Sequence, residues 1–376
     1  MIIMGKQKIG IVTFPLEKAS VSPLYNISHI FSCLTDDIYV ITGNAGIDAA
    51  QKLESMSFKI INHNTGSSTI TRIFNYAKTQ LTLTSSMLKL SKNVDTWVFP
   101  ICGESLLPCM ILAKLQQKPV IMLLPSSTKS IMTCQSDPLN LIILLFTKIN
   151  YLLSTKIILY SPELITEWNL EKYRQKILIA YHHFLDLNTF SATIPLTDRP
   201  ALIGYIGRLS AEKGIENFAQ ALPAILHDHQ NFHANIGGDG PLKEEIKVIL
   251  EEDNLTTRVS LLGWISHDDL PKYLNKFRLL VLPSYTEGLP NIMLEAMACG
   301  TPVLATPVGA IPDVIIDGKT GFIMENNSPE CIAENVKRAL SSPELERIAE
   351  RGRQFVRGNY TLEHVMDRWN EVLEEL

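Results

Sequence analysis

Two glutamates, Glu287 and Glu295, lie on either side of a break in the sequence SYTEGLPNIMLEAMACG. Pro290 is expected in the first turn of a helix that ends at Gly300, before Pro302. The N-terminus of such a helix offers unpaired N–H groups and a partial positive charge to an anion. A phosphate would repel a carboxylate, so Glu287 must reach past the anion to uncharged hydroxyl groups, and Glu295 must reach its other side. This arrangement suits a nucleotide-sugar, with one acceptor for the sugar hydroxyls and one for the ribose diol.

Two cations follow an earlier apolar run, ALIGYIG, in the sequence RLSAEKG. Arg208 and Lys213 lie between Gly207 and Gly214. Cations at the carboxyl end of a strand, facing the start of the next helix, suit a pyrophosphate. The alternative is that both side chains are solvated surface groups.

Two further loops have weaker signals. In GGDG, Gly238 and its neighbours allow the backbone to approach a ligand closely, although an ordinary turn has the same composition. The loop after RVSLLGW begins at Ile265, where backbone groups are expected to bond the edge of a nucleobase. The case for a ligand at these loops is stronger because they follow successive predicted strands, as the cationic loop does.

The elements that must position these loops are short apolar runs separated by amphipathic stretches, which predict parallel strands buried on both faces. The runs form two series, separated by a linker at 193–200. We therefore predict an α/β fold with two doubly wound, Rossmann-like domains, 1–192 and 200–358, which face a cleft. Residues 359–376 are expected to form a helix that packs across the domains. The predicted strands are 8–14, 37–43, 58–62, 96–101, 119–125, 156–161, 201–207, 232–238, 258–264, 278–284, 302–307 and 320–324.

The bulk composition suits a globular protein: 46% of the 376 residues are hydrophobic and 19% are charged. The net charge of −5 indicates no nucleic-acid partner, but residues 1–190 have a net charge of +5 and the remainder −10. The basic first half favours phosphorylated ligands or acidic lipid headgroups, unless the asymmetry is chance. Six scattered cysteines, with no Cys-x-x-Cys, predict a cytoplasmic protein.

The apolar stretch 139–153 is too short to span a bilayer. It is either a buried helix covering a sheet or a helix on a membrane surface. In the second case the protein would contact the inner face of the cell membrane.

Residues 200–340 resemble the donor-binding domain of family-four (group 1) retaining glycosyltransferases, which have the GT-B fold. The resemblance rests on YIGRLSAEKGIE, GGDGPLKEEI, LGWISHDDLPKYL and the segment around Glu287 and Glu295, which match the family's Glu-x7-Glu pair. It implies that Arg208 and Lys213 bind the donor diphosphate, that Glu287 contacts the hexose and that Glu295 holds the ribose. The residues whose backbone amides it places near the sugar and phosphate are Gly288, Leu289 and Asn291.

The first domain departs from the family pattern. PLEKASVSPLY replaces the glycine-rich loop, and Ser126 and Ser127 occupy the place of a histidine. His182 and His183 replace an Asn-Gly; they either take over a sugar contact or form a structural pair. Glu104 is a candidate for an acceptor-side role or for a helix cap.

The resulting functional prediction is a hexosyl transfer from a UDP- or GDP-sugar to a glycan or a lipid-linked acceptor. No Asp-x-Asp occurs in the chain, so no metal ion or other cofactor is expected. The alternatives are a nucleotide-sugar epimerase of the same shape and an inactive nucleotide-sugar-binding protein.

Overall fold

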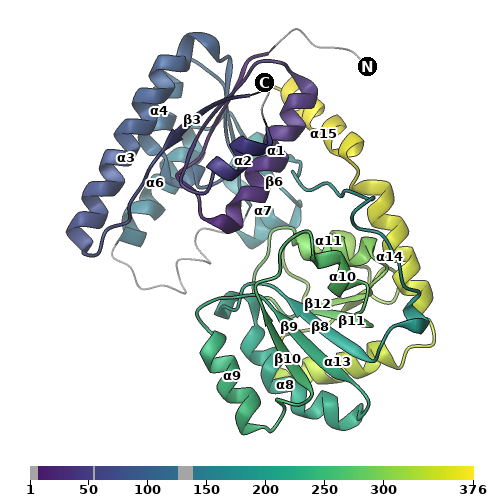
Figure 1. Cartoon of the computed structure of the whole chain (residues 1–376). Helices are drawn as coiled ribbons and strands as arrows, with labels where there is room; N and C mark the ends of the chain where they lie inside the picture. Colours follow the sequence, from purple (N-terminus) through teal and green to yellow (C-terminus); the bar gives the residue numbers. More distant parts are fainter. Residues whose placement is uncertain (1–6, 54–55, 126–138) are drawn as a thin grey trace. The chain divides into compact units, whose positions relative to one another are not determined.

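A computed structural model of the chain describes residues 7–53, 56–125 and 139–376. The chain divides into two compact units, each a parallel sheet with helices on both faces (Figure 1). Unit 1 is Met1–Phe184 with Leu362–Leu376, and unit 2 is Leu185–Thr361. The two doubly wound, Rossmann-like units of the predicted α/β fold are confirmed.

The sheet of unit 1 has the order β3-β2-β1-β4-β5-β6-β7, with all neighbours parallel. Its central strand β1 pairs Ile9 with Ile38 of β2 and with Thr96 of β4. The strand order therefore reverses on either side of β1. The strands are β1 (Ile9–Val12), β2 (Ile38–Gly43), β3 (Ser57–Ile61), β4 (Thr96–Phe99), β5 (Val120–Leu123), β6 (Lys156–Leu159) and β7 (Ile177–Ile179).

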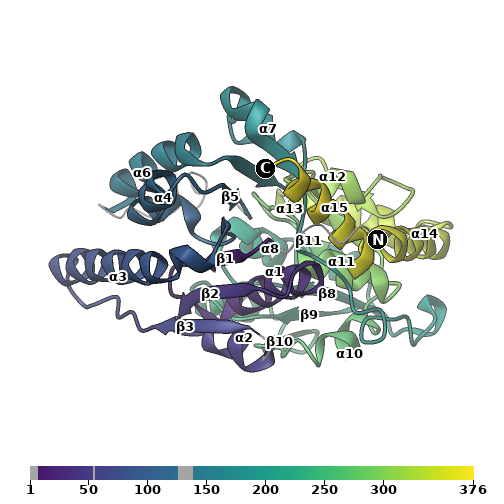
Figure 2. The same cartoon turned by 90° about the horizontal axis from the view of Figure 1, so that it is seen from above.

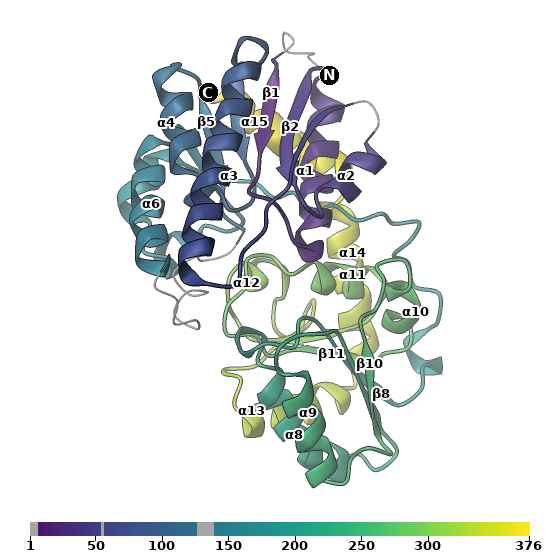
Figure 3. The same cartoon turned by 60° about the vertical axis from the view of Figure 1, so that its left-hand side comes forward.

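Helices cover both faces of this sheet (Figures 1 and 3). On one face α3 packs on α4 and α4 on α6; on the other, α1 packs on α2 and α15. Figure 2 shows the C-terminal helix α15 next to α1, although the two lie at opposite ends of the sequence. The helices of unit 1 are α1 (Val21–Leu34), α2 (Ile47–Lys52), α3 (Thr69–Leu90), α4 (Leu107–Leu115), α6 (Leu139–Leu153), α7 (Glu163–Glu167) and α15 (Leu362–Glu374).

The sheet of unit 2 has the order β10-β9-β8-β11-β12-β13, again all parallel. Here β8 occupies the position of reversal, with β9 on one side and β11 on the other. The strands are β8 (Leu202–Ile206), β9 (His233–Gly237), β10 (Val259–Gly263), β11 (Leu279–Leu282), β12 (Val303–Ala305) and β13 (Phe322–Ile323).

On one face of this sheet α8 packs against α9 and α13, and on the other α11 packs against α10 and α14. The helices of unit 2 are α8 (Ile215–Asp228), α9 (Lys243–Glu252), α10 (Leu270–Leu274), α11 (Asn291–Ala298), α12 (Ile311–Val314), α13 (Pro329–Leu340) and α14 (Leu345–Asn359).

Strands β1 and β8 each contain a glycine that lies under a buried aromatic ring. Gly10 of β1 lies under Trp97, and a Cβ there would come within 2.3 Å of the indole ring. Gly204 of β8 lies under Phe277 in the same way, at 2.2 Å. Both aromatic side chains are fully buried. A glycine in each central strand thus makes room for a large aromatic ring in the core.

All twelve predicted strands form, each within one or two residues of the predicted ends at most places. Strand β7 was not predicted. It has three residues, all only half-buried, and follows a short 3₁₀ helix rather than a longer amphipathic stretch.

The predicted domain boundaries differ from those observed. The stretch 193–200 lies inside unit 2, where Arg199 is buried and donates to the carbonyl oxygens of Phe277 (2.9 Å) and Cys299 (2.7 Å). The chain joins unit 2 already at Leu185, whose N–H donates to Tyr360 O at 2.9 Å. At the other end, 362–376 returns to unit 1, because Trp369 packs against Phe31 with ring centroids 5.0 Å apart.

Residues 139–153 form helix α6, as predicted. Asn150 is fully buried and its amide donates to the carbonyl oxygens of Gly103 and Glu104. Leu145 and Leu152 are exposed on the other side. The helix therefore covers the sheet with one side and presents leucines outward with the other. Within the described ranges, no helix combines the length and apolarity needed to cross a bilayer.

Candidate functional site

The four loops singled out in the sequence follow β8, β9, β10 and β11, which are neighbours in one parallel sheet. Their carboxyl ends therefore lie at the same edge. The loops after β8 and β11 flank the position where the strand order reverses. In doubly wound sheets this is where ligands bind.

The loops after β8 and β9 are held together backbone to backbone. Gly207 donates its N–H to Gly237 O at 3.0 Å, and Gly238 donates to Gly263 O at 2.7 Å. Gly238 has φ +133°, and a Cβ there would come within 1.8 Å of Gly207 O. Only glycine fits at this position, for both reasons.

The loop after β8 also docks on the end of β11. Gly214 has φ +65°, and a Cβ there would meet Pro283 O at 1.9 Å. Two residues earlier in the loop, Glu212 O accepts from the N–H of Tyr285 at 2.9 Å. These contacts carry Lys213 to the loop that contains Glu287.

Lys213 and Glu287 form a bidentate ion pair. The ammonium nitrogen Nζ lies 2.8 Å from both Oε1 and Oε2 of the carboxylate. The Glu287 side chain is 10% exposed and that of Lys213 is 29% exposed. Ser284 Oγ also donates to Glu287 Oε1, at 2.7 Å. Two of the three ammonium protons are thus engaged, and the third is available to a ligand.

Arg208 follows Gly207 at the same strand end, and its side chain is exposed. Its carbonyl oxygen accepts from Tyr205 Oη at 2.9 Å. Burial raises the pKa of Tyr205, and the negative charge of Glu287 raises it further, so this phenol remains a hydrogen-bond donor. Among the described residues, no hydrogen bond or ion pair joins the Arg208 guanidinium to Lys213 or Glu287.

Helix α11 begins at Asn291 rather than at the predicted Pro290, which precedes it with extended backbone. The helix ends at Ala298, and Gly300 follows with φ +70°. Gly288 and Leu289 are buried, whereas Asn291 is half-buried at the start of the helix. Gly288 O accepts from the N–H of Ala310 at 2.7 Å, which fixes the loop before the helix.

Glu295 lies in the middle of α11 and is 7% exposed. Its Oε1 is 2.9 Å from Nε2 of His267, in the loop after β10. The His267 ring in turn meets Phe190 edge-on at 5.1 Å. The second predicted acceptor is therefore held by a neighbouring loop, separately from the Lys213–Glu287 pair.

Ile265 is half-buried and packs over Gly237, where a Cβ would come within 2.5 Å of its Cδ1. Its backbone thus lies next to the loop after β9. His267 and Ser284 were not among the predicted site residues. Ser284 is three residues from Glu287, so its position in the same loop could have indicated this contact. Nothing in the spacing of His267 indicated Glu295 as its partner.

The first-unit candidates are buried. Glu104 is 8% exposed and accepts from Tyr151 Oη at 3.0 Å. It lies within a 3₁₀ turn, Gly103–Ser105, so it is not the residue that caps the following helix. Ser126 and Ser127 lie outside the described residues.

His182 and His183 stack with ring centroids 4.2 Å apart, and His182 Nδ1 is 3.0 Å from Tyr160 Oη. They are 2% and 5% exposed. Burial lowers the pKa of His182 to about 3. The geometry favours the structural interpretation of this pair.

Comparison with known proteins agrees with the resemblance seen in the sequence. Residues 188–355 match the family described as glycosyl transferases group 1. Alpha-D-kanosaminyltransferase of Streptomyces kanamyceticus is 32% identical over 182 residues, which are 48% of this chain and 47% of that protein. The capsular polysaccharide biosynthesis glycosyltransferase CapM of Staphylococcus aureus is 28% identical over 173 residues, 46% of this chain and 44% of that protein. The chain thus matches about half the length of these curated relatives.

The fold likeness extends over nearly the whole chain. The crystal structure of Anabaena HepE in complex with UDP and glucose has a TM-score of 0.76 and 16% identity, covering 97% of this chain and 99% of that chain. This confirms the predicted GT-B fold. The predicted resemblance to group 1 glycosyltransferases is confirmed for the matched residues.

Proposed function

We propose that this chain, whose residues 188–355 match the group 1 glycosyl transferases, is a retaining hexosyltransferase. It takes the hexosyl unit from a UDP- or GDP-sugar and transfers it, without a metal ion, to a glycan or a lipid-linked acceptor. The observation that carries the proposal is the Lys213–Glu287 pair at the position where the strand order reverses.

The donor diphosphate is bound by Lys213, Arg208 and the N–H groups at the start of α11. Lys213 retains one free donor in the ion pair, so a phosphate oxygen can join it without displacing Glu287. Gly207 and Gly238 let the backbone approach the phosphates. The amides of Gly288, Leu289 and Asn291 serve the phosphate and the sugar.

The two carboxylates orient the parts on either side of the diphosphate. Glu287 is fixed by Lys213 and Ser284 and accepts from hexose hydroxyls. Glu295 accepts from the ribose diol, in place of or beside its bond to His267. Backbone groups at Ile265 bond the base.

In the reaction, the bond between C1 of the hexose and the diphosphate oxygen breaks, and a bond from C1 to the acceptor hydroxyl oxygen forms. The hydroxyl proton passes to the leaving phosphate, and the nucleoside diphosphate departs. Negative charge grows on the diphosphate as the bond breaks. Fixed cations stabilise this charge where a metal ion would otherwise do so.

Three observations support the proposal beyond the site. HepE, which has the same fold, was crystallised with UDP and glucose. CapM acts in capsular polysaccharide biosynthesis by its name, which fits a glycan or lipid-linked acceptor. The net charge of +5 in residues 1–190 suits a cytoplasmic protein that works at the inner face of the cell membrane.

The test is a panel of labelled UDP- and GDP-hexoses, incubated with the protein and a crude glycan and lipid acceptor fraction. We expect one donor to raise the melting temperature, because a ligand at a hundred times its Kd stabilises the folded state by about 2.7 kcal/mol. The same donor gives a labelled glycosidic product with chelator present. Isomerised donor without product would indicate an epimerase, and stabilisation without turnover an inactive binder; either would contradict the proposal.

A further inference from the structure

Helix α3 has a second apolar face, turned away from the core. Its buried residues, such as Leu83 and Met87, pack toward the sheet. On the other side four large side chains are exposed by 57% to 81%. At 3.6 residues per turn they fall within a strip about 40° wide. These four residues, called the α3 stripe below, are Ile70, Phe74, Leu81 and Leu88.

The α3 stripe is long, and burial in the protein does not explain it. From Ile70 to Leu88 the helix rises about 27 Å. Figure 3 shows α3 at the outside of unit 1. A row of exposed large apolar side chains on a folded protein is typical of a binding surface.

The charge around the stripe has one sign. Residues 55–94 contain five basic side chains and no Asp or Glu. Lys59, Lys78 and Lys89 are exposed, and none of them takes part in an ion pair among the described residues. On the helix, Lys78 and Lys89 lie about 80–100° from Ile70, along one edge of the stripe. This surface is therefore complementary to a partner that is both apolar and anionic.

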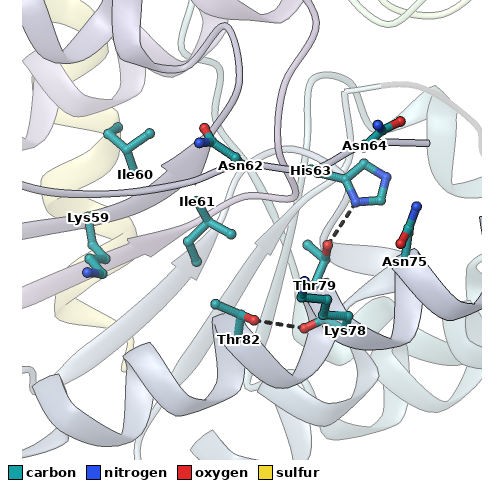
Figure 4. A pocket seen from close by; sticks show the side chains of 10 residues that line it. All are labelled: Lys59, Ile60, Ile61, Asn62, His63, Asn64, Asn75, Lys78, Thr79 and Thr82. Carbon is teal, nitrogen blue, oxygen red and sulfur yellow. Dashed lines mark hydrogen bonds between the residues drawn. The ribbon is translucent and has the colours of Figure 1, made fainter. Parts of the chain in front are cut away.

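Two adjoining pockets lie along this basic edge. One of 550 Å³ includes Phe74 and Leu81 of the stripe, and one of 380 Å³ is polar; both include Lys59 and Lys78. Figure 4 shows the polar pocket, whose lining includes the amide side chains of Asn62 and Asn75 as well as the two lysines. Ammonium and amide donors of this kind suit a phosphate group.

The walls of the polar pocket are held in place. His63 Nδ1 is 2.8 Å from Thr79 Oγ1, which ties the end of β3 to α3. The His63 ring also meets Phe14 edge-on, with ring centroids 4.8 Å apart. The pocket is thus supported by the core of unit 1.

We propose that the α3 stripe and its basic edge dock the protein on an anionic bilayer surface, with α3 in the plane of the membrane and a lipid phosphate in the pocket of Lys59 and Lys78. The four apolar side chains enter the boundary between headgroups and acyl chains. The lysines supply about 1 kcal/mol each toward an anionic surface. This deepens the membrane location within the proposed function and assigns it to α3 rather than to α6, the helix suggested by the sequence.

The test is flotation of the whole protein with two kinds of vesicle. One contains phosphatidylcholine alone, and the other contains in addition about 40% phosphatidylglycerol, which gives the vesicle a negative surface. No donor or acceptor is present, so the result does not depend on glycosyl transfer. We expect binding only to the anionic vesicles. Salt at about 0.5 M should weaken this binding, because it shortens the Debye length to a few Å. Phe74→Ser/Leu81→Ser lowers the partition coefficient by about tenfold or more. Lys78→Gln/Lys89→Gln lowers it by about 25-fold, or fivefold for each lysine.

Matched controls place the changes elsewhere. Leu145→Ser/Leu152→Ser removes the exposed leucines of α6, and Lys247→Gln removes an exposed lysine of α9; both leave binding unchanged. All altered side chains are exposed, and unchanged melting temperatures confirm folding. Stabilisation by a soluble nucleoside diphosphate reports the proposed donor site independently.

Four results would overturn the docking proposal. They are no binding to anionic vesicles, equal binding to neutral ones, loss of binding in the α6 variant instead of the α3 variants, and a dimer in solution that only Phe74→Ser/Leu81→Ser disrupts. The last result would assign the stripe to a second copy of the chain.

Discussion

At the residue scale, the candidate site depends on how the ammonium donors of Lys213 are divided between Glu287 and a phosphate. The ammonium is neutralised by Glu287, yet keeps one donor for a phosphate. The pair therefore holds a cation ready without leaving an unpaired charge in a largely buried place.

We predict that Lys213→Ala lowers kcat by about 10²- to 10³-fold, which corresponds to about 2.7–4 kcal/mol of transition-state stabilisation. The reason is that charge on the leaving diphosphate develops next to this ammonium. Initial rates at saturating donor measure the effect. Lys247→Ala, an exposed position on α9, serves as the control. Turnover within about twofold of the unmodified protein would remove Lys213 from the proposed mechanism.

A second prediction concerns Glu295. If it accepts from the ribose diol, the unmodified protein binds the nucleoside diphosphate more tightly than its 2′,3′-dideoxy analogue, by about tenfold or more. Glu295→Gln should lose most of this discrimination, because the charged acceptor is gone. Titration calorimetry with both ligands measures it. A variant that still discriminates fully would show that another group holds the ribose.

The sequence indicated these charged residues but not their partners. Glu287 and Glu295 were found from a motif within one loop and one helix. The pairing of Glu295 with His267 joins a helix to a loop, and the two residues are 28 positions apart in the sequence. Such a contact depends on how the neighbouring strands bring their loops together, which a single sequence does not encode locally.

At the element scale, glycines decide how the loops meet. Gly214→Ala should lower the melting temperature and weaken donor binding, because a Cβ at φ +65° would strike Pro283 O and push Lys213 away from the β11 loop. A cost of about 1–3 kcal/mol is expected. Gly358→Ala in α14 is the matched control, since nothing lies within 4 Å of its Cβ position. It should raise stability by about 0.5–1 kcal/mol. Equal melting temperatures for the two variants would contradict this account.

The elements themselves were largely predictable. Apolar runs with β-branched residues gave twelve strands, because a parallel sheet covered on both faces needs such runs. The same reasoning failed at 193–200, which looked like a linker because of its prolines. Arg199 anchors that stretch through the carbonyl oxygens of Leu274 at the end of α10, Phe277 between α10 and β11, and Cys299 just after α11, none of which is near it in the sequence.

We therefore predict that Arg199→Ala destabilises unit 2 by about 3 kcal/mol, since several buried carbonyl groups lose their donor. Arg199→Lys should restore little of this, because a single ammonium does not reach the same oxygens in a fork. Thermal unfolding with and without a saturating nucleoside diphosphate provides the measurement. Full rescue by lysine would show that charge alone matters there.

At the scale of the whole molecule, the chain crosses from one unit to the other twice. The helix α15 was predicted, but not that it belongs to unit 1. Trp369 donates its indole N–H to Tyr181 O at 3.0 Å and packs on Phe31, contacts between residues far apart in the chain. The helical spacing of 362–374 shows that an apolar face exists, but it does not identify the surface that covers it.

The stacked histidines of unit 1 give a pH dependence that the whole chain should report. Burial lowers the pKa of His182 to about 3, and burial together with the neighbouring His182 lowers the pKa of His183. Both ordinarily titrate near 6.5. Below that pH the unfolded chain binds protons that the folded chain does not. The stability they contribute is therefore complete above pH 6.5 and is lost as the pH falls from 6.5 toward 3.

We predict that urea unfolding followed by tryptophan fluorescence loses up to about 1.4 kcal/mol per pH unit for each histidine below pH 6.5. The signal reports mainly unit 1, which contains Trp97, Trp168 and Trp369, three of the four tryptophans. His182→Gln, which keeps an acceptor for Tyr160 Oη, should flatten the slope between pH 6.5 and 5 by about half, whatever its effect at pH 7.5. His227→Gln, at a histidine that is 85% exposed, should leave the slope unchanged. An equal slope in the His182 variant and the unmodified chain would mean that this pair is not kept neutral by burial.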